Sequence, residues 1–413
     1  MTLRDRLAQF GPGLLYAGAA VGVSHLVQST RAGAEFGLQL MAVVILTNVI
    51  KYPIFEAGPR YAAATGKSLL DGYRQIGKWA VAVYMIMSVA TMFIVMGAIS
   101  LVTAGLFAHL TGMTLEAPFV AVILLVISLF ILGWGKYSTL DRVMKFIIIL
   151  LTVSTVLALG FSWIEPTIRS EEFMKVFDFG DRTHVLFLVA LIGWMPAPID
   201  ISIWHSVWSV SKNKEQGRRA TLKQALLDFK VGYWGTMLLA CCFVGLGAVI
   251  MYGTPESPAS GSVDFADQLV RMYTANLGQW AFPFIALAAF TTMFSTLLTC
   301  LDAFPRTLRC SSKLVSQRYE DRRFHNGLYW FWLILTALGT SVILLFFTRD
   351  MRALVDVATT LSFVIAPVFA ILNFVAMHRS DVPEEAKPSL WLKRFNIASI
   401  ALLLIFSLWY LVY

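Results

Sequence analysis

The stretch GWMPAPIDISIWHSVW, residues 193–208, decides which fold this sequence predicts. It lies inside an apolar run, yet it contains prolines at 196 and 198, followed by Asp200 and His205. A proline inside a helix removes a backbone donor and clashes with a preceding carbonyl, so the pair predicts a helix that stops and restarts. In lipid such a break is tolerated only where protein or water satisfies the freed backbone groups.

The composition of the whole chain is that of an integral membrane protein. Of its 413 residues, 58% are hydrophobic and 14% are charged, and the mean hydropathy is +0.70. The net charge of +8 does not indicate a nucleic-acid partner, because the lysines and arginines cluster in short loops between apolar segments. We expect a lipid bilayer and a small ion or solute as partners; the sequence gives no indication of oligomeric state.

Eleven apolar runs are long enough to cross about 30 Å of hydrocarbon. The sequence therefore predicts an all-α integral membrane protein with one transmembrane transporter domain over residues 1–413. The approximate limits of the runs are 12–33, 39–63, 79–109, 115–134, 144–165, 183–208, 228–251, 276–302, 327–347, 353–377 and 392–412.

Loop charges predict the orientation of these helices. With a cytoplasmic N-terminus, the inside loops are rich in lysine and arginine, as at 212–223 and 306–323, and the opposite loops are acidic or mixed, as at 165–181 and 256–267. We expect a multi-pass protein of the inner (plasma) membrane with its C-terminus outside. The N-terminus has no cleavable signal pattern, and the four cysteines show no metal-binding or disulfide spacing.

A second interruption is predicted in the first helix, where GAAVGVSH, residues 18–25, contains two glycines that permit bending. Helices one and six occupy matching positions in two five-helix halves. Transporters built from inverted repeats bind their substrate near the membrane midplane, between two such unwound segments. We expect repeat one at about 11–165, repeat two at about 183–377 and an extra helix at about 392–412.

Ionisable side chains inside spans are costly and are therefore candidate functional groups. Asp200 lies two residues after Pro198, in the first turn of the restarted helix, where its carboxylate either is favoured by the helix dipole or binds a substrate or ion; the two roles are compatible. His25 lies on the other interrupted helix, as a site residue or as a packing residue.

Two further ionisable side chains are candidates for a proton relay, each with a structural alternative. Glu56 precedes Arg60 by four residues, the spacing of an ion pair within one helix. His205 lies between Trp204 and Trp208, where an interfacial aromatic belt explains it as well as proton transfer does.

Several motifs resemble those of the NRAMP divalent-metal transporters. The resemblance covers most of the chain and implies the LeuT-type inverted-repeat fold, five helices plus five with one extra helix and with helices one and six interrupted. It rests on Gly11-Pro12-Gly13, on RAGAEFG (31–37), on RYAAATGKSLLDGYR (60–74), on GKYSTLDRVMKFII (135–148), and on Met195-Pro196, which matches the start of the family's MPH motif.

The same alignment shows departures at the family's metal site. Where the family has DPGN, this chain has residues 22–25, so that the metal-binding aspartate is Gly22 and the asparagine is His25. The histidine of MPH is Ala197, and the acidic residue of helix three falls at Met92. Of the metal ligands that the resemblance implies, only Met195 is kept.

A replacement metal site can be written from His25, Met195 and Asp200 together with carbonyls freed at the two breaks. Manganese and ferrous iron accept oxygen and nitrogen ligands with a softer thioether. A single carboxylate predicts a weak, partly hydrated cation. We therefore expect a transporter of divalent cations of the manganese, iron or magnesium class, either coupled to protons as a symporter or uncoupled, with no cofactor.

Two other functions stay open. Aromatic rings at Tyr16, Trp194, Trp204 and Trp208, together with Asp200, would suit an organic cation or an amino acid. A sensor that has kept the fold and lost transport would be expected to carry a signalling domain, and none is evident. An enzyme is not expected, because the sequence contains no nucleophile elbow, phosphate loop or HExxH motif.

Overall fold

The computed structural model describes residues 11–133, 137–162, 169–316, 322–347 and 350–413, and every regular element in these ranges is a helix. Seven helices there are individually long and apolar enough to cross a membrane, so the chain is a multi-pass membrane protein. Shorter apolar helices span Ala117–Gly133, Leu150–Ser162 and Arg182–Trp194. The fold class is confirmed, whereas the count of eleven crossings and the repeat boundaries stay predictions.

The helices follow one another with short connections. In order they are α2 (Pro12–Ala20), η1 (Ser24–Ser29), α3 (Thr30–Phe36), α4 (Met41–Thr65), α5 (Leu69–Ile76), α6 (Lys78–Thr111), α7 (Ala117–Gly133), α8 (Tyr137–Ser162), η2 (Glu171–Phe173), α9 (Arg182–Trp194), α10 (Asp200–Glu215), α11 (Leu222–Ile250), α12 (Ser262–Leu277), η3 (Gln279–Ala281), α13 (Phe282–Val315), α14 (Arg322–Phe346), α15 (Met351–Met377), η5 (Glu384–Ala386) and α16 (Leu390–Val412). The motif at 135–148 lies partly outside the described residues.

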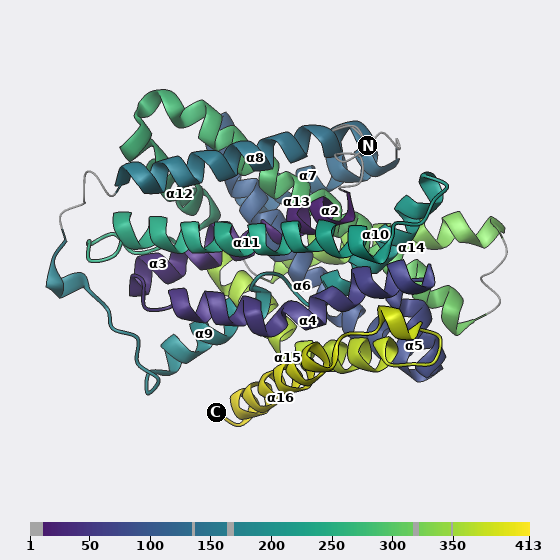
Figure 1. The fold of residues 1–413 in the computed structure, drawn as a ribbon. Helices are drawn as coiled ribbons and strands as arrows, with labels where there is room; N and C mark the ends of the chain where they lie inside the picture. The colour runs from purple at the N-terminus through teal and green to yellow at the C-terminus, as the bar shows by residue number, and fades with distance from the viewer. Residues whose placement is uncertain (1–10, 134–136, 163–168, 317–321, 348–349) are drawn as a thin grey trace, which may run out of the picture.

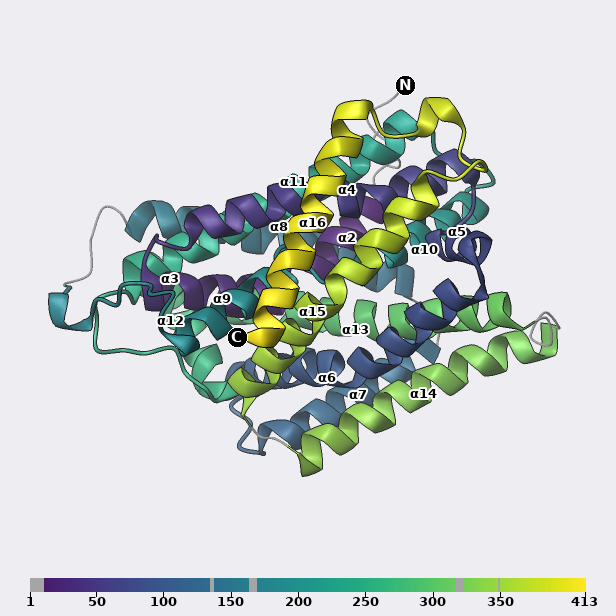
Figure 2. The same cartoon turned by 90° about the horizontal axis from the view of Figure 1, so that it is seen from below.

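Most of the long helices run along roughly one direction, α15 and α16 cross them obliquely, and the half-helices lie among them (Figures 1 and 2). One end of the bundle carries the C-terminal ends of α4, α10 and α13 with their lysines and arginines, and we call it the basic end. The opposite end carries the C-terminus of α3 and the start of α9, and we call it the acidic end. Helices α14 and α16 lie at the periphery, where α16 exposes leucine, isoleucine and tryptophan side chains to the surroundings.

Both predicted interruptions are confirmed. The first span is divided between Ala20, where α2 ends, and Ser24, where η1 begins. The sixth is divided between Trp194 and Asp200, with both prolines of the pair in the gap. Each expected span therefore consists of two half-helices that meet inside the bundle.

The second half of the first span lies backbone to backbone against α11. A Cβ atom on Gly33 would stand 2.0 Å from the carbonyl oxygen of Val244, and one on Gly247 would stand 2.3 Å from that of Thr30. Small residues allow such close approach between membrane helices. Helix α11 therefore acts as a fixed support for α3.

The start of α9 has a conventional cap. The backbone N–H of Thr183 donates to the Asp181 carboxylate at 2.7 Å, and the Thr183 hydroxyl donates to the same oxygen at 2.7 Å. These two bonds hold the pKa of the Asp181 carboxyl below its usual range. The sequence after the cap can then enter the bundle as a helix up to the proline pair.

Substituting Gly33→Ala should destabilise the protein, because the new methyl group would overlap the Val244 carbonyl. Overpacking of this kind costs about 1–3 kcal/mol, and we expect a fall of several degrees in the midpoint of thermal unfolding in detergent. The matched control is Gly160→Ala in α8, where a Cβ atom would meet nothing within 4 Å. Equal midpoints for the two variants would contradict the close packing of α3 on α11.

Candidate functional site

The two interrupted spans touch each other at their breaks. The Ser24 hydroxyl, in the first turn of η1, lies 2.8 Å from the carbonyl oxygen of Ala20 and 3.2 Å from that of Pro196. It therefore reaches the end of its own half-helix and the gap of the other span. This contact places both breaks in one region of the bundle.

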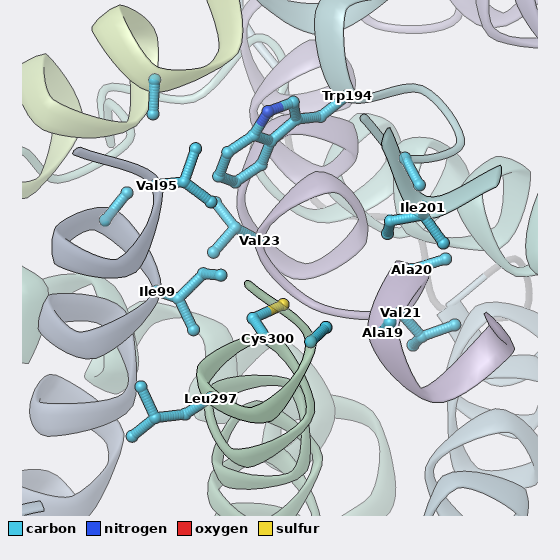
Figure 3. Packing of buried hydrophobic residues seen from close by; sticks show 14 of the residues in the cluster. Ala19, Ala20, Val21, Val23, Val95, Ile99, Trp194, Ile201, Leu297 and Cys300 are labelled. Carbon is cyan, nitrogen blue, oxygen red and sulfur yellow. The ribbon is translucent and has the colours of Figure 1, made fainter. Parts of the chain in front are cut away.

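Every residue that the sequence predicted for the site is buried. His25, Met195 and Ala197 are fully enclosed, and Asp200 is 7% exposed. Figure 3 shows what surrounds the first break: Val95 and Ile99 of α6 on one side, and Cys300 and Leu297 of α13 on another. Mostly apolar side chains therefore enclose the breaks.

Gly22 occupies the position of the family's aspartate, and a threonine of α13 fills the space beside it. A Cβ atom on Gly22 would lie 2.8 Å from Thr296 Cγ2 and 2.9 Å from its Oγ1. The same hydroxyl lies 3.0 Å from the Gly18 carbonyl oxygen and 3.3 Å from that of Val21. Thr296 therefore lies within hydrogen-bond distance of carbonyls at the end of α2. It also occupies the space that an aspartate side chain at position 22 would need.

Both ring nitrogens of His25 are engaged by the chain itself. Nε2 lies 3.0 Å from the Thr236 carbonyl oxygen, to which it donates, and Nδ1 lies 2.8 Å from the Ser24 hydroxyl. Because a carbonyl only accepts, the hydrogen must be on Nε2. His25 can therefore bind a cation only after it gives up one of these contacts.

The other predicted site residues pack in different groups of apolar side chains. Met195 packs in a small cluster with Leu191, Ala240 and Val244, while Ala197 belongs to the main core. In the part of the chain that the structure describes, no three His, Cys, Asp or Glu side chains form a group able to hold a metal. The replacement site, which combines one histidine, one methionine and one aspartate with backbone carbonyls, stays a prediction.

Asp200 is the first residue of α10, as the position after the prolines predicted. Asp200 therefore lies in the first turn of the restarted helix, where the helix dipole favours a carboxylate, although no side-chain cap hydrogen bond is present at the start of α10. Among the described residues, no basic side chain lies within ion-pair distance of this carboxylate. Tyr84 and Cys300 lie within range of its charge. Asp200 is thus a buried carboxyl group at the second break.

Sequence reasoning missed a buried cation at the same break. Lys51, in the middle of α4, is fully buried, and its Nζ donates to the carbonyl oxygens of Ile192 at 2.6 Å and Gly193 at 3.0 Å. The available signal was a lysine inside an apolar run, the same kind of signal that singled out Glu56.

The two candidates for a proton relay lie toward the basic end. The ion pair between Glu56 and Arg60 is confirmed, and Arg60 also donates to the carbonyl oxygen of Ala386 at 3.0 Å. Neither ring nitrogen of His205 has a hydrogen-bond partner in the described part of the chain, and the nearby Pro12 backbone is outside hydrogen-bond geometry. The His205 ring packs 6.2 Å from that of Tyr16.

The four aromatic residues predicted as a possible cage are not all in contact: Trp204 and Trp208 pack on each other with 6.2 Å between ring centroids, whereas Tyr16 and Trp194 have other partners. Tyr16 stacks on Tyr233 with 5.9 Å between ring centroids, and Trp204 packs on Phe304 at 4.8 Å. Trp194 instead donates through Nε1 to the Ser362 hydroxyl of α15 at 2.8 Å. The four rings therefore belong to more than one group of contacts.

A network of ion pairs links α3 and α15 at the acidic end. Arg31 of α3 donates to the Asp356 carboxylate of α15 at 2.7 and 3.4 Å, and Arg352 pairs with Glu35 at 2.9 Å. The network borders a cavity of about 690 Å³ that His184 also lines. These ion pairs connect α3 to α15 at the acidic end.

At the basic end, a carboxylate holds the start of α2. Asp228 of α11 is buried and accepts from the backbone N–H groups of Gly11 at 3.2 Å and Gly13 at 2.7 Å, at the start of α2. A negative charge at a helix N-terminus is also favoured by the helix dipole. Asp228 therefore links the start of α2 to α11.

Substituting Asp228→Ala should free α2 from α11. Charge-assisted hydrogen bonds of this kind contribute about 1.5–3 kcal/mol, so amide hydrogen exchange in residues 12–20 should rise about tenfold or more. The control is Asp264→Ala, an exposed residue in the first turn of α12 at the acidic end. Unchanged exchange in residues 12–20 of the Asp228 variant would show that the carboxylate does not hold α2.

Comparisons with known proteins agree with this architecture. Residues 13–413 match the family model described as Nramp, natural resistance-associated macrophage protein-like. An uncharacterized protein of Pasteurella multocida (strain Pm70), PM0681, is 33% identical over 403 residues, which cover 96% of this chain and 90% of that protein. The divalent metal cation transporter MntH of Pediococcus pentosaceus is 23% identical over 265 residues, 61% of this chain and 57% of that protein.

Solved structures show the same fold at low sequence identity. A variant of the manganese transporter of Eremococcus coleocola superposes with a TM-score of 0.69 at 12% identity, covering 98% of this chain and 86% of that chain. MhsT in complex with L-phenylalanine superposes with a TM-score of 0.62 at 14% identity, covering 97% of each chain. The match of the family model over nearly the whole length, together with the two broken spans, shows that this chain belongs to the Nramp family.

Proposed function

We propose that this protein is a secondary transporter that carries a divalent metal cation across the plasma membrane by alternating access, and that it is not an enzyme. Family membership and the metal-transporter names of its relatives support the proposal. The observation that carries it is the contact between the two broken helices, with the buried Asp200 carboxylate beside it and without an ion-pair partner in the described residues.

The groups at the breaks suit a hard or borderline cation. Asp200 supplies one carboxylate, Ser24 a hydroxyl, and the half-helix ends supply the carbonyls of Val21 and Pro196. Oxygen donors of this kind bind magnesium and manganese, and the nearby Met195 offers a softer sulfur. With one carboxylate the cation would keep several of its waters, and the apolar walls must move apart to admit it.

Contacts at the two ends of the bundle would separate in turn during alternating access. In this proposal the basic end faces the cytoplasm, as the loop charges predict, and the C-terminus lies outside. The Arg31–Asp356 pair parts when the site opens outward, and the Asp228 contact with α2 parts when it opens inward. A pathway that is never open at both ends moves cargo without leaking other ions.

Substituting Asp200→Asn should remove the cation's one carboxylate while keeping the size of the side chain. In liposomes we expect manganese influx to fall at least about tenfold, a loss of roughly 1.4 kcal/mol or more. Glu171→Gln, on an exposed residue at the acidic end, is the control and should transport normally.

The same liposomes separate the open alternatives. Manganese, magnesium and calcium influx is compared with uptake of amino acids and organic cations while internal pH is followed. Divalent influx without internal acidification would leave the metal proposal in place and exclude proton coupling. Uptake of an organic solute with no divalent influx or binding at millimolar concentrations would exclude the metal proposal.

Restoring the family's aspartate should require a second change in α13. Gly22→Asp alone should fold poorly, because Thr296 occupies the space beside position 22. Gly22→Asp combined with Thr296→Ala should fold and bind manganese at least about tenfold more tightly than the natural chain, since a second carboxylate raises affinity. Gly22→Asn with Thr296→Ala is the uncharged control. A well-folded Gly22→Asp variant would show that Thr296 does not block this position.

A further inference from the structure

The most unusual buried charge in the bundle is the ammonium group of Lys51. It lies in the middle of α4, it is fully enclosed, and its Nζ donates to the carbonyl oxygens of Ile192 and Gly193 at 2.6 and 3.0 Å. No carboxylate lies within ion-pair distance of it among the described residues. Its partner is therefore the carbonyl end of α9.

Burying an unpaired ammonium costs several kcal/mol, so its position must be compensated. The last carbonyls of a helix have no partner within the helix and carry a partial negative charge. Helix α9 ends at Trp194, inside the bundle, where water is excluded. The Ile192 carbonyl already accepts from the Met195 N–H at 3.3 Å, and Lys51 adds donors to both Ile192 and Gly193 and a positive charge at this end.

Lys51 and Asp200 are complementary across the same break. The Lys51 side chain donates to the carbonyl end of α9, and Asp200 is in the first turn of α10. A positive charge at the first place and a negative charge at the second are each favoured by the dipole of the half-helix there.

In transporters with broken helices, carbonyls at half-helix C-terminal ends coordinate a co-transported cation such as sodium. We propose that the Lys51 ammonium is a resident cation at the carbonyl end of α9, filling that position from within the chain, so that transport needs no monovalent co-ion there. This proposal rests on the transport function proposed above. It also assigns the cargo cation to the Asp200 side of the break, because the ammonium repels a second positive charge.

The test replaces Lys51 in two ways. Lys51→Ala leaves a space the size of the lost side chain, and Lys51→Gln fills it with an uncharged donor. Manganese influx is measured in liposomes with choline as the only monovalent cation, and then with sodium, potassium, ethylammonium or propylammonium added. The control is Lys230→Gln, an exposed lysine of α11.

The proposal predicts a specific pattern. Natural-chain influx should be the same with choline, sodium or potassium. With choline, manganese influx by Lys51→Ala should be at least about tenfold lower than that of the natural chain, and a small alkylammonium or an alkali cation should restore most of it. Influx by Lys51→Gln should fall as much, and the added cations should not restore it. The thermal unfolding midpoint of the alanine variant should rise with the same added cations, and that of the glutamine variant should not.

Three results would overturn it: sodium-dependent influx by the natural chain, normal influx by Lys51→Gln in choline, or no effect of any added cation on either influx or unfolding of Lys51→Ala. If the natural chain moves no divalent cation, the proposed function fails by itself. The unfolding midpoints then decide the role of Lys51, because cation rescue of stability does not depend on the identity of the cargo.

Discussion

The structure depends on one constraint: backbone groups freed inside a membrane must find partners in the protein. The chain frees such groups twice, between Ala20 and Ser24 and between Trp194 and Asp200. Each set of freed groups is served by a side chain from elsewhere in the fold, Thr296 of α13 at the first break and Lys51 of α4 at the second. The breaks are therefore stable because side chains of the surrounding helices hydrogen-bond to the freed backbone groups.

These partners also explain why the site departs from the family pattern without collapsing. With glycine at position 22, the neighbouring space is taken by Thr296, whose hydroxyl serves the carbonyls at the end of α2. The charge at the breaks is redistributed as well, to a carboxylate on α10 and an ammonium on α4. A site with one carboxylate and a nearby ammonium favours a loosely held, hydrated cation over a tightly bound dehydrated one.

Local signals in the sequence predicted several local features. The proline pair at 196 and 198 predicted the break in the sixth span and the first-turn position of Asp200, and the spacing of Glu56 and Arg60 predicted their ion pair. Proline alone would have misled, because Pro53, Pro305 and Pro367 lie within continuous helices. What marked the real break was two prolines with a carboxylate two residues after the second, in the first turn of the next helix.

The partners at the breaks could not be predicted in the same way, because they come from residues far away in the chain. Thr296 lies 278 positions from Gly18, and Lys51 lies 141 positions from Ile192. A threonine in an apolar helix is ordinary, and Lys51 carried a signal only as a buried charge without a visible partner. His25 shows the converse: its position suggested a ligand, but the carbonyl of Thr236 already takes one of its nitrogens.

The central claim is that cargo binds where the two broken helices meet, on the Asp200 side. The most direct measurement is an anomalous difference map from crystals of the protein grown with manganese. The account predicts one peak between the two breaks, within coordination distance of the Asp200 carboxylate and away from the Lys51 ammonium. A peak confined to the ion network of Arg31, Glu35 and Asp356, or one lying against the carbonyls of Ile192 and Gly193, would contradict it.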